Sequence, residues 1–343
     1  MTEILKLDPS APESEKLIPA AEIIKAGGLV AFPTETVYGL GASATDATAA
    51  MKIYAAKGRP SDNPLIIHIA DPKDAELYAY TNELYYKLAE AFMPGPLTVI
   101  LPKKDTIPGS VTGGLDSVAI RCPAHPVASE LIKLAGVAIA APSANLSGSP
   151  SPTCAQHVIS DLSGRVDMII DGGTSEIGLE STIVKIDEDS AILLRPGAIT
   201  CDALSCICKN VEIAAAVTSH LAENERPLSP GMKYRHYAPS SPLVLLDGDD
   251  DAVLKYMKNA LETERCLVIC YDEELEHLGA SSTISIGPRE DLSAQANLLF
   301  AALRQANDIP SDMIYAHLPT KDGLGLALYN RMIRAAAHTV KKI

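Results

Sequence analysis

The sequence contains no uninterrupted apolar run approaching about 18 residues, so we expect no membrane-spanning helix. Its first residues lack a basic segment followed by an apolar one, and we therefore expect no signal peptide and a cytoplasmic protein. Positive charge is also scarce: 29 Lys and Arg stand against 43 Asp and Glu in 343 residues, a net charge of −14. Tight intrinsic binding of nucleic acid is disfavoured, because clustered basic side chains are what hold a phosphate backbone.

No C-x-x-C pair occurs among the seven cysteines. A cytosolic protein keeps its thiols reduced, so we do not read these residues as a disulfide framework. Cys201, Cys206 and Cys208 lie close together, but no histidine stands at ligand spacing beside them. We therefore expect no metal site built by protein side chains.

Several catalytic signatures are missing as well. There is no Walker A motif, no G-x-G-x-x-G fingerprint, no G-x-S-x-G elbow and no H-E-x-x-H helix. The sequence therefore shows no covalent nucleophile paired with a base. This absence favours chemistry in which reactants are positioned and phosphate charge is stabilised.

Short apolar runs alternate with amphipathic segments along most of the chain. This alternation predicts an α/β layer fold. Residues 83–92 follow the N-cap types Thr81 and Asn82 and are typical of a helix, as are residues 46–56. Strands are predicted over residues 29–32, 65–69, 97–101, 118–120, 137–140, 168–170, 183–186 and 192–194. Because the last two follow one another without a helix between them, we expect a mixed sheet.

A change in composition at residues 222–242, which are rich in proline and lack apolar periodicity, is typical of an interdomain linker. Beyond it, strand candidates at 243–246, 266–270, 283–286 and 313–315 are mostly separated by helical patterns at 250–261, 291–306 and 325–337. We predict a first domain over 1–215, a linker over 216–242 and a smaller Rossmann-like α/β domain over 243–343, for which the sequence indicates no ligand.

Polar residues gather where predicted strands end, which is where α/β proteins place ligand contacts. A polar loop is expected over 32–41, and Lys57 and Arg59 together suit a phosphate or carboxylate. The small polar side chains of 141–148 suit phosphate oxygens. Structural alternatives stay open: hydroxyls that satisfy their own turns, basic residues at a helix end, and His68 as a hydrogen-bonded core residue. The residues alone predict a pocket for a nucleotide-like anion.

Taken together, these stretches resemble the L-threonylcarbamoyladenylate synthase family. The matching pieces, in the family's order, are PTETVYGLG (33–41), KGRP with NPL (57–65), SANLSG (143–148), STIV (181–184), LRPG (194–197) and SPGMKYRHYAP (229–239). The resemblance implies a YrdC-like twisted mixed sheet with helices, followed by the C-terminal domain of the family's long form. It also implies a nucleotidyltransferase that forms L-threonylcarbamoyladenylate and pyrophosphate from L-threonine, bicarbonate and ATP. A separate tRNA threonylcarbamoyltransferase would then modify the adenosine next to the anticodon, so this chain need not hold tRNA tightly.

The resemblance implies roles for individual residues. Lys57 and Arg59 are the expected catalytic residues, with Lys57 near the carbamate or neighbouring phosphate oxygens. Residues similar to the family's threonine contacts are Thr34, His68, Arg121 and Ser181. Residues similar to its ATP contacts are Arg59, Asn63, Ser117, Ala141, Ser143, Asn145, Ser151 and Arg195. Mg²⁺ is expected with ATP, held mainly by phosphates and waters.

The linker is expected to act as a lid through Tyr234 and His236, because closure would exclude water and protect a labile mixed anhydride. A flexible tether is the alternative. Two other functions also stay open. One is carbamoyl transfer to another substrate, as in hydrogenase-maturation carbamoyltransferases, although this chain lacks their zinc-finger and acylphosphatase-like segments. The other is a non-catalytic double-stranded RNA-binding module, which the net charge of −14 disfavours.

Overall fold

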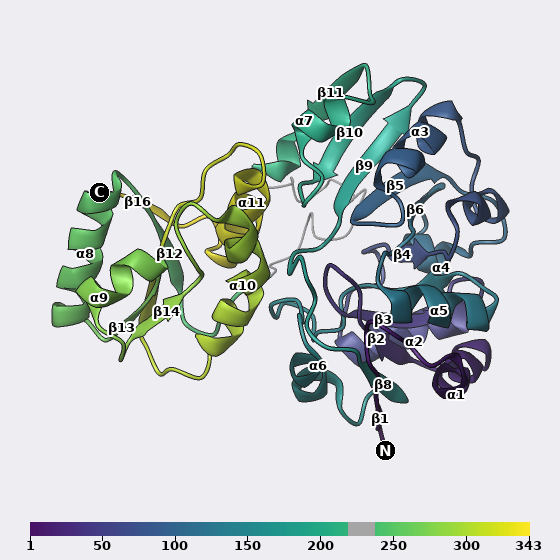
Figure 1. Ribbon diagram of the computed structural model, residues 1–343, viewed down its shortest axis with the longest axis horizontal. Helices are drawn as coiled ribbons and strands as arrows, with labels where there is room; N and C mark the ends of the chain where they lie inside the picture. The colour runs from purple at the N-terminus through teal and green to yellow at the C-terminus, as the bar shows by residue number, and fades with distance from the viewer. Residues whose placement is uncertain (219–236) are drawn as a thin grey trace. The chain divides into compact units, whose positions relative to one another are not determined.

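Two sheets, one of eleven strands and one of five, organise residues 1–218 and 237–343, the part of the chain that the computed structural model describes. Each sheet belongs to its own unit (Figure 1). The second unit also includes the short segments 148–150 and 177–179. The predicted lid residues Tyr234 and His236 lie outside the described residues, as does most of the predicted linker. The boundaries predicted for the two domains and the linker stay a prediction.

The first unit contains a mixed sheet, as predicted. Across the sheet its strands are β1 (Glu3–Lys6), β8 (Met168–Asp171), β2 (Val30–Phe32), β3 (Gly39–Ser43), β7 (Ile139–Ala140), β4 (Ile66–His68), β6 (Ser117–Arg121), β5 (Leu97–Pro102), β9 (Thr182–Asp187), β10 (Ser190–Arg195) and β11 (Asn210–Ile213). β4 runs parallel to β6, and β5 parallel to β9. In contrast, β5 and β6 are antiparallel, and so are β9 and β10. Parallel and antiparallel strand pairs therefore alternate in the part of the sheet near the site described below.

Helices of the first unit bury apolar stripes against this sheet. They are α1 (Ser14–Lys25), α2 (Ala47–Lys57), α3 (Glu83–Phe92), α4 (Gly109–Thr112), α5 (Pro126–Ala135), α6 (Ala155–Leu162) and α7 (Cys201–Ser205), with 3₁₀ turns η1 (Pro72–Leu77) and η2 (Ala215–Val217). In α1 the buried residues Leu17, Ala20, Ala21 and Ile24 recur at helical spacing. They share one core with α5, β2 and β8. None of the described helices is long and apolar enough to cross a membrane.

The polar loop expected over 32–41 is shorter than predicted, because Gly39 already begins strand β3. A Cβ on Gly41 would lie 2.7 Å from a methyl group of Ile139 and 2.8 Å from the ring of Phe32. Glycine therefore lets β3 pass close to these two side chains. The glycines that suggested a loop serve close packing within a strand.

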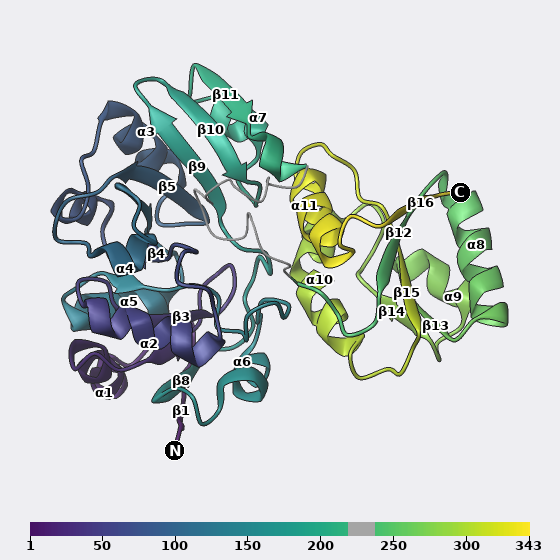
Figure 2. The same cartoon turned by 180° about the vertical axis from the view of Figure 1, so that it is seen from behind.

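The second unit is a parallel sheet between two layers of helices, which confirms the predicted smaller α/β architecture (Figure 2). Its strands are β14 (Thr283–Ser285), β13 (Cys266–Cys270), β15 (Met313–His317), β12 (Leu243–Asp247) and β16 (Val340–Lys342), in spatial order. α8 (Asp250–Thr263), η3 (Asp272–Glu274) and α9 (Leu275–Leu278) lie on one side, and α10 (Leu292–Gln305) and α11 (Gly325–Ala335) on the other. All strand pairs are parallel, so their carboxyl ends meet at one edge.

Candidate active site

Four of the predicted site residues meet at one edge of the first unit's sheet. His68 ends β4 and pairs in register with Arg121, which ends β6. Arg121 in turn stands opposite Thr98 near the start of β5. Ser181 immediately precedes β9, and Arg195 ends the antiparallel strand β10. Strand direction thus brings together side chains that lie far apart in the sequence.

Arg121 is the buried cation of this edge. Its Nη1 donates to Thr36 Oγ1 at 2.7 Å and its Nε donates to the carbonyl oxygen of Gly95 at 3.3 Å. Its Nη2 lies 2.7 Å from Glu35 Oε1, and only 5 % of the Arg121 side chain and 8 % of the Glu35 side chain are exposed. Even so, no aligned hydrogen bond from the described residues reaches Arg121 Nη2 or either Glu35 oxygen. The pair is held by charge, and it retains hydrogen-bonding capacity for a ligand.

The turn between β2 and β3 supports Arg121 through hydroxyl groups. Thr34 Oγ1 donates to the carbonyl oxygen of Val37 at 2.6 Å and lies 2.8 Å from Thr36 Oγ1. Ser175 Oγ donates to the carbonyl oxygen of Thr34 at 2.9 Å. The hydroxyl of Thr34 therefore satisfies its own turn, which is the structural alternative predicted for it. The same bonds orient Thr36 toward the guanidinium.

His68 is neutral at this edge. Burial, followed by the positive charge of Arg121, lowers its pKa to about 3. Its Nδ1 lies 3.3 Å from the carbonyl oxygen of Ile139, and the ring of Phe32 meets it edge-on at 6.1 Å between centroids. When Nδ1–H donates to that carbonyl, Nε2 becomes a hydrogen-bond acceptor.

Ser181 links three strands at the same edge. Arg195 donates from Nε to the Ser181 carbonyl oxygen and from Nη2 to Ser181 Oγ, both at 3.0 Å. Thr98 Oγ1 lies 2.7 Å from Ser181 Oγ. Nearby in sequence, Ser151 Oγ donates to Glu180 Oε1 at 2.6 Å. Arg195 and Ser181, predicted to touch different substrates, are thus direct neighbours.

Lys57 enters from the end of α2. The helix starts at the N-cap Asp46, whose side chain accepts from two backbone amides, and it ends before Gly58 at φ 61°. Lys57 is 2 % exposed, and its Nζ donates to the carbonyl oxygens of Ser143 and Asn145. Lys57 therefore fixes the loop after β7 as well as ending a helix.

Around this loop, Ser143 Oγ donates to Asn145 Oδ1 at 2.5 Å, while the backbone amide of Ala141 donates to the Ile66 carbonyl oxygen at 2.8 Å. Arg59 Nη2 donates to the carbonyl oxygen of Pro64 at 3.1 Å. Asn63 is 2 % exposed, and its Oδ1 accepts no hydrogen bond from any residue in the described ranges. That buried acceptor is available to a donor or a cation from outside the described residues.

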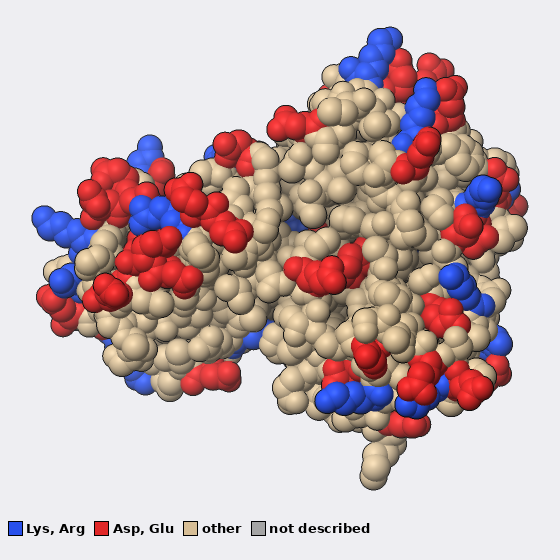
Figure 3. All heavy atoms as spheres, in the orientation of Figure 1, with Lys and Arg blue, Asp and Glu red and all other residues tan. Residues whose placement is uncertain are grey.

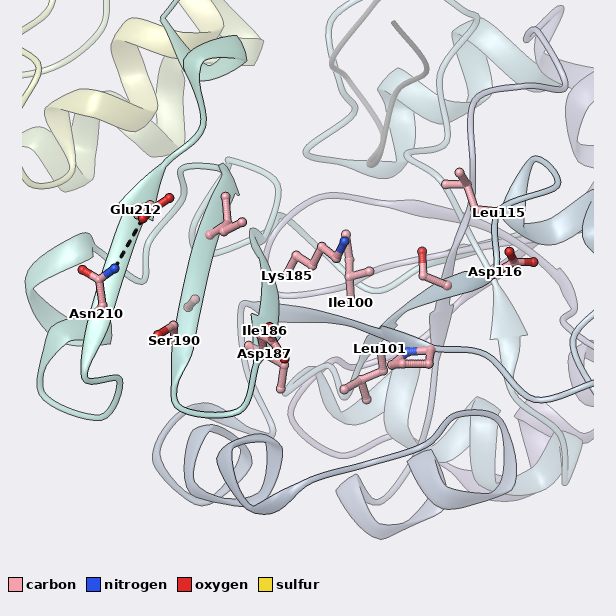
Figure 4. A pocket seen from close by; sticks show the side chains of 14 residues that line it. Ile100, Leu101, Leu115, Asp116, Lys185, Ile186, Asp187, Ser190, Asn210 and Glu212 are labelled. Atoms are coloured by element: carbon pink, nitrogen blue, oxygen red, sulfur yellow. Dashed lines mark hydrogen bonds between the residues drawn. The ribbon is translucent and has the colours of Figure 1, made fainter.

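Ser117 lies apart from these residues. It begins β6, four residues before Arg121, so the two side chains share a face of the sheet about 13 Å apart along the strand. Ser117 lines a cavity of about 650 Å³, to which β5, β6, β9, β10 and β11 also contribute residues. Figure 4 shows Ile100, Lys185 and Asn210 around this cavity. Its volume suits a small molecule or part of one.

Sequence reasoning missed Glu35, Thr36, Thr98 and Glu180 as members of this edge. Glu35 and Thr36 lie inside the stretch 33–41, so an acidic residue between two threonines at a strand end was an available signal. Thr98 is a polar residue inside the apolar run 97–101, which indicates a strand face that meets other polar groups.

Comparison with known proteins shows what the chain is similar to. Residues 22–197 match the family model described as telomere recombination, and residues 199–337 match that of the threonylcarbamoyl-AMP synthase C-terminal domain. The chain is 43 % identical over 336 residues to the threonylcarbamoyl-AMP synthase of Bacillus subtilis, covering 97 % of this chain and 96 % of that protein. It is 42 % identical over 338 residues to the enzyme of the same name from Pyrococcus abyssi, covering 96 % and 97 %. The crystal structure of P. abyssi Sua5 complexed with L-threonine aligns with a TM-score of 0.93 at 41 % identity, covering 100 % of both chains.

Proposed function

The chain belongs to the threonylcarbamoyl-AMP synthase family, and on this premise we propose that it forms L-threonylcarbamoyladenylate and pyrophosphate from L-threonine, bicarbonate and ATP. The observation that carries the proposal is the buried edge of Arg121, Glu35 and neutral His68. It occurs in a chain that aligns over its whole length with a relative solved in complex with L-threonine. The reaction makes the protein a nucleotidyltransferase.

A zwitterionic amino acid supplies what the Arg121–Glu35 pair lacks. Its carboxylate can accept from the Arg121 guanidinium, and its ammonium can donate to the oxygens of Glu35. Both groups are buried, so these charge-assisted bonds form away from water and are stronger for it. The hydroxyl groups of Thr34 and Ser181 line the same edge and suit a side-chain hydroxyl.

Carbamate formation requires a neutral amine, so the ammonium group of the bound amino acid first gives up one proton to the surrounding water. The amine attacks the carbon of bicarbonate and forms the N–C bond, and one water leaves, which balances the step as R–NH₂ + HCO₃⁻ → R–NH–COO⁻ + H₂O. His68 stays neutral at physiological pH because its pKa is lowered to about 3. Its Nε2 can therefore accept a hydrogen bond from the amine or hydroxyl without adding positive charge beside Arg121.

The carbamate oxygen then attacks the α-phosphorus of ATP, and pyrophosphate leaves with the electron pair of the broken P–O bond. Lys57, Arg59 and Arg195 provide the positive charge that this step requires. Lys57 also fixes the loop of Ser143 and Asn145, whose polar groups suit phosphate oxygens. Ser117 stays a proposed contact of ATP, although it lines the separate cavity described above.

Mg²⁺ is proposed to enter with ATP. In the described part of the chain no three His, Cys, Asp or Glu side chains converge as a metal site, so protein ligands would be few. The unpartnered Oδ1 of Asn63 fits such an ion, directly or through a water, because Mg²⁺ takes oxygen ligands and keeps much of its hydration. When bound, Mg²⁺ would neutralise charge on the leaving pyrophosphate.

We also propose that the reaction takes place in the cytoplasm and that a separate enzyme transfers the product to tRNA. All seven cysteines are free, which accords with a reducing compartment.

Pyrophosphate release by the purified protein, with threonine and bicarbonate omitted in turn, tests the proposal. Release should require both. Arg121→Gln should raise the KM for threonine by about 10- to 100-fold through the lost charge-assisted bonds while leaving that for ATP unchanged. Arg265→Gln, at a residue whose side chain is 66 % exposed, is the matched control. Release without threonine would point to carbamoyl transfer to another acceptor, and no release would contradict the proposal.

A further inference from the structure

A second cavity, of about 550 Å³, lies within the second unit and takes no part in the proposed reaction. It opens at the carboxyl ends of β12, β13 and β15, where Asp247, Tyr271 and His317 line it. Parallel α/β sheets bind their ligands at this edge. The volume falls within the range of small-molecule sites.

One wall of the cavity is an ordered charge network around Glu274, which is 1 % exposed. Both of its carboxylate oxygens lie 3.0 Å from His317 Nε2. Arg289 donates from Nη2 to Glu274 Oε1 at 2.8 Å and from Nη1 to Asp250 Oδ2. Burial alone would raise the pKa of Glu274, but the hydrogen bond from His317 and the charge of Arg289 outweigh it and lower that pKa. Glu274 is therefore ionised and neutralises Arg289 from inside the fold.

Two buried side chains on the cavity wall are held in place by hydrogen bonds, and Gln295 retains an acceptor for a ligand. Gln295, 3 % exposed, donates from Nε2 to the carbonyl oxygens of Pro288 and Arg289 at 2.8 Å each. No residue of the described ranges donates to its Oε1. His317, 7 % exposed, directs Nε2 to Glu274, which can only accept, and its Nδ1 has no hydrogen-bond partner within the same ranges.

The charged groups of the cavity select the sign of the ligand. Carboxylates reach it from three segments: Asp247 at the end of β12 and Asp250 at the start of α8, Glu290 after β14, and Asp322 after β15. On the face of the second unit shown in Figure 3, Asp and Glu side chains gather around the Lys and Arg. Because Arg289 is already paired with two carboxylates, the cavity keeps negative charge and repels anions.

Two further observations narrow the class of cation. No three His, Cys, Asp or Glu side chains converge as a metal site among residues 1–218 and 237–343, so the carboxylates are spread out rather than focused on one ion. The Tyr271 ring stacks on His317 at 4.7 Å between centroids, and the Arg289 guanidinium lies 5.2 Å from its centre. Since these groups already occupy the aromatic ring, stacking does not favour an aromatic ligand.

From this cavity of spread carboxylates and the buried amide oxygen of Gln295, we propose that the second unit contains a binding site for a small aliphatic polyamine. Protonated amines donate several hydrogen bonds each, and linked ammonium groups match carboxylates from separate loops. Asp250 Oδ1, 4.0 Å from His317 Nδ1, and Gln295 Oε1 are the groups expected to receive them.

Calorimetric titration of the full-length protein with putrescine and with spermidine tests this site. We expect one site per chain, with affinity that falls as salt rises. Asp250→Asn and Gln295→Leu should each weaken binding by about tenfold, as for a lost charge-assisted hydrogen bond. Asp251→Asn on the same helix turn, and Gln305→Leu at the exposed end of α10, are matched controls that should bind as the natural sequence does.

The amine should also raise the unfolding temperature of the natural protein and of both controls, more than it does in the two cavity variants. The proposal is overturned if neither amine binds at millimolar concentration, or if the cavity variants bind like the controls. It is also overturned if MgCl₂ alone saturates the site and displaces the amine, since the cavity would then be a metal site. None of these residues belongs to the proposed synthase site, so either proposal can fail without the other.

Discussion

Removing Arg121 should destabilise the edge of the first sheet and raise the KM for threonine, and the two effects can be separated. Arg121→Met preserves volume but leaves the Glu35 carboxylate buried without its counterion. Breaking a buried ion pair in this way costs about 3–5 kcal/mol. Glu35→Gln should cost a similar amount by leaving the guanidinium unpaired. The double variant should recover most of the loss, because it buries neither charge alone.

Hydrogen exchange measured by mass spectrometry suits this test, because it reports the local stability of peptides around β3 and β6. At 1.4 kcal/mol per factor of ten, each single variant should speed exchange there by roughly 10²- to 10³-fold. The double variant should return to within about tenfold of the natural protein. The KM for threonine in pyrophosphate release should stay raised in the double variant, because Arg121 is still absent.

Two results would refute this reasoning. Exchange that is unchanged in Arg121→Met would mean that the Arg121–Glu35 pair is not a desolvated charge pair. A KM for threonine that returns to the natural value in the double variant would mean that Arg121 does not bind the threonine carboxylate.

Three other substitutions test the same site. In the natural protein, His68 binds a proton in the unfolded chain below about pH 6.5 but in the folded chain only near its pKa of about 3. The free energy of unfolding of the natural protein should therefore fall by roughly 2–3 kcal/mol between pH 6.5 and about 4.5. His68→Gln should remove this pH dependence. Urea midpoints across that range would show it, and parallel profiles for both proteins would contradict it. Gly58→Ala should cost about 1 kcal/mol in thermal unfolding, because φ is 61° but no atom lies within 4 Å of the added Cβ. Lys57→Met should reduce kcat for pyrophosphate release by about 10²-fold or more, whereas Lys52→Met, which removes a bond to the Gly27 carbonyl oxygen from the same helix, should not.

Elements with strong local signals were predictable from the sequence. Helix α3 occupies the predicted range Glu83–Phe92, because the Asn82 side chain accepts from the Tyr85 amide at 2.9 Å and caps it. Strand β13 occupies Cys266–Cys270 as predicted, since all five residues are buried and apolar. In contrast, helix α1 was not predicted, and it contains Pro19 and has no side-chain cap.

The residues missed at strand ends follow one pattern. β6 was expected over 118–120, yet backbone pairing extends it to Ser117 and Arg121, where polar side chains follow the apolar run. Apolar periodicity detects the buried middle of a strand and not its polar ends. Strand pairing was equally out of reach, because the contacts of Arg121 with Glu35 and Thr36 depend on the order of strands across the sheet.

The position of β1 has a consequence for synthesis on the ribosome. Glu3 pairs with Met168, so this first strand has no partner until β8 has been made. At 5–20 residues per second that wait is on the order of 10–30 s, and an unpaired strand is a template for aggregation. β1 is short, and its charged residues Glu3 and Lys6 are exposed even in the folded protein. The charged residues at both ends of β1 suit a strand that stays unpaired until the rest of the sheet has been made.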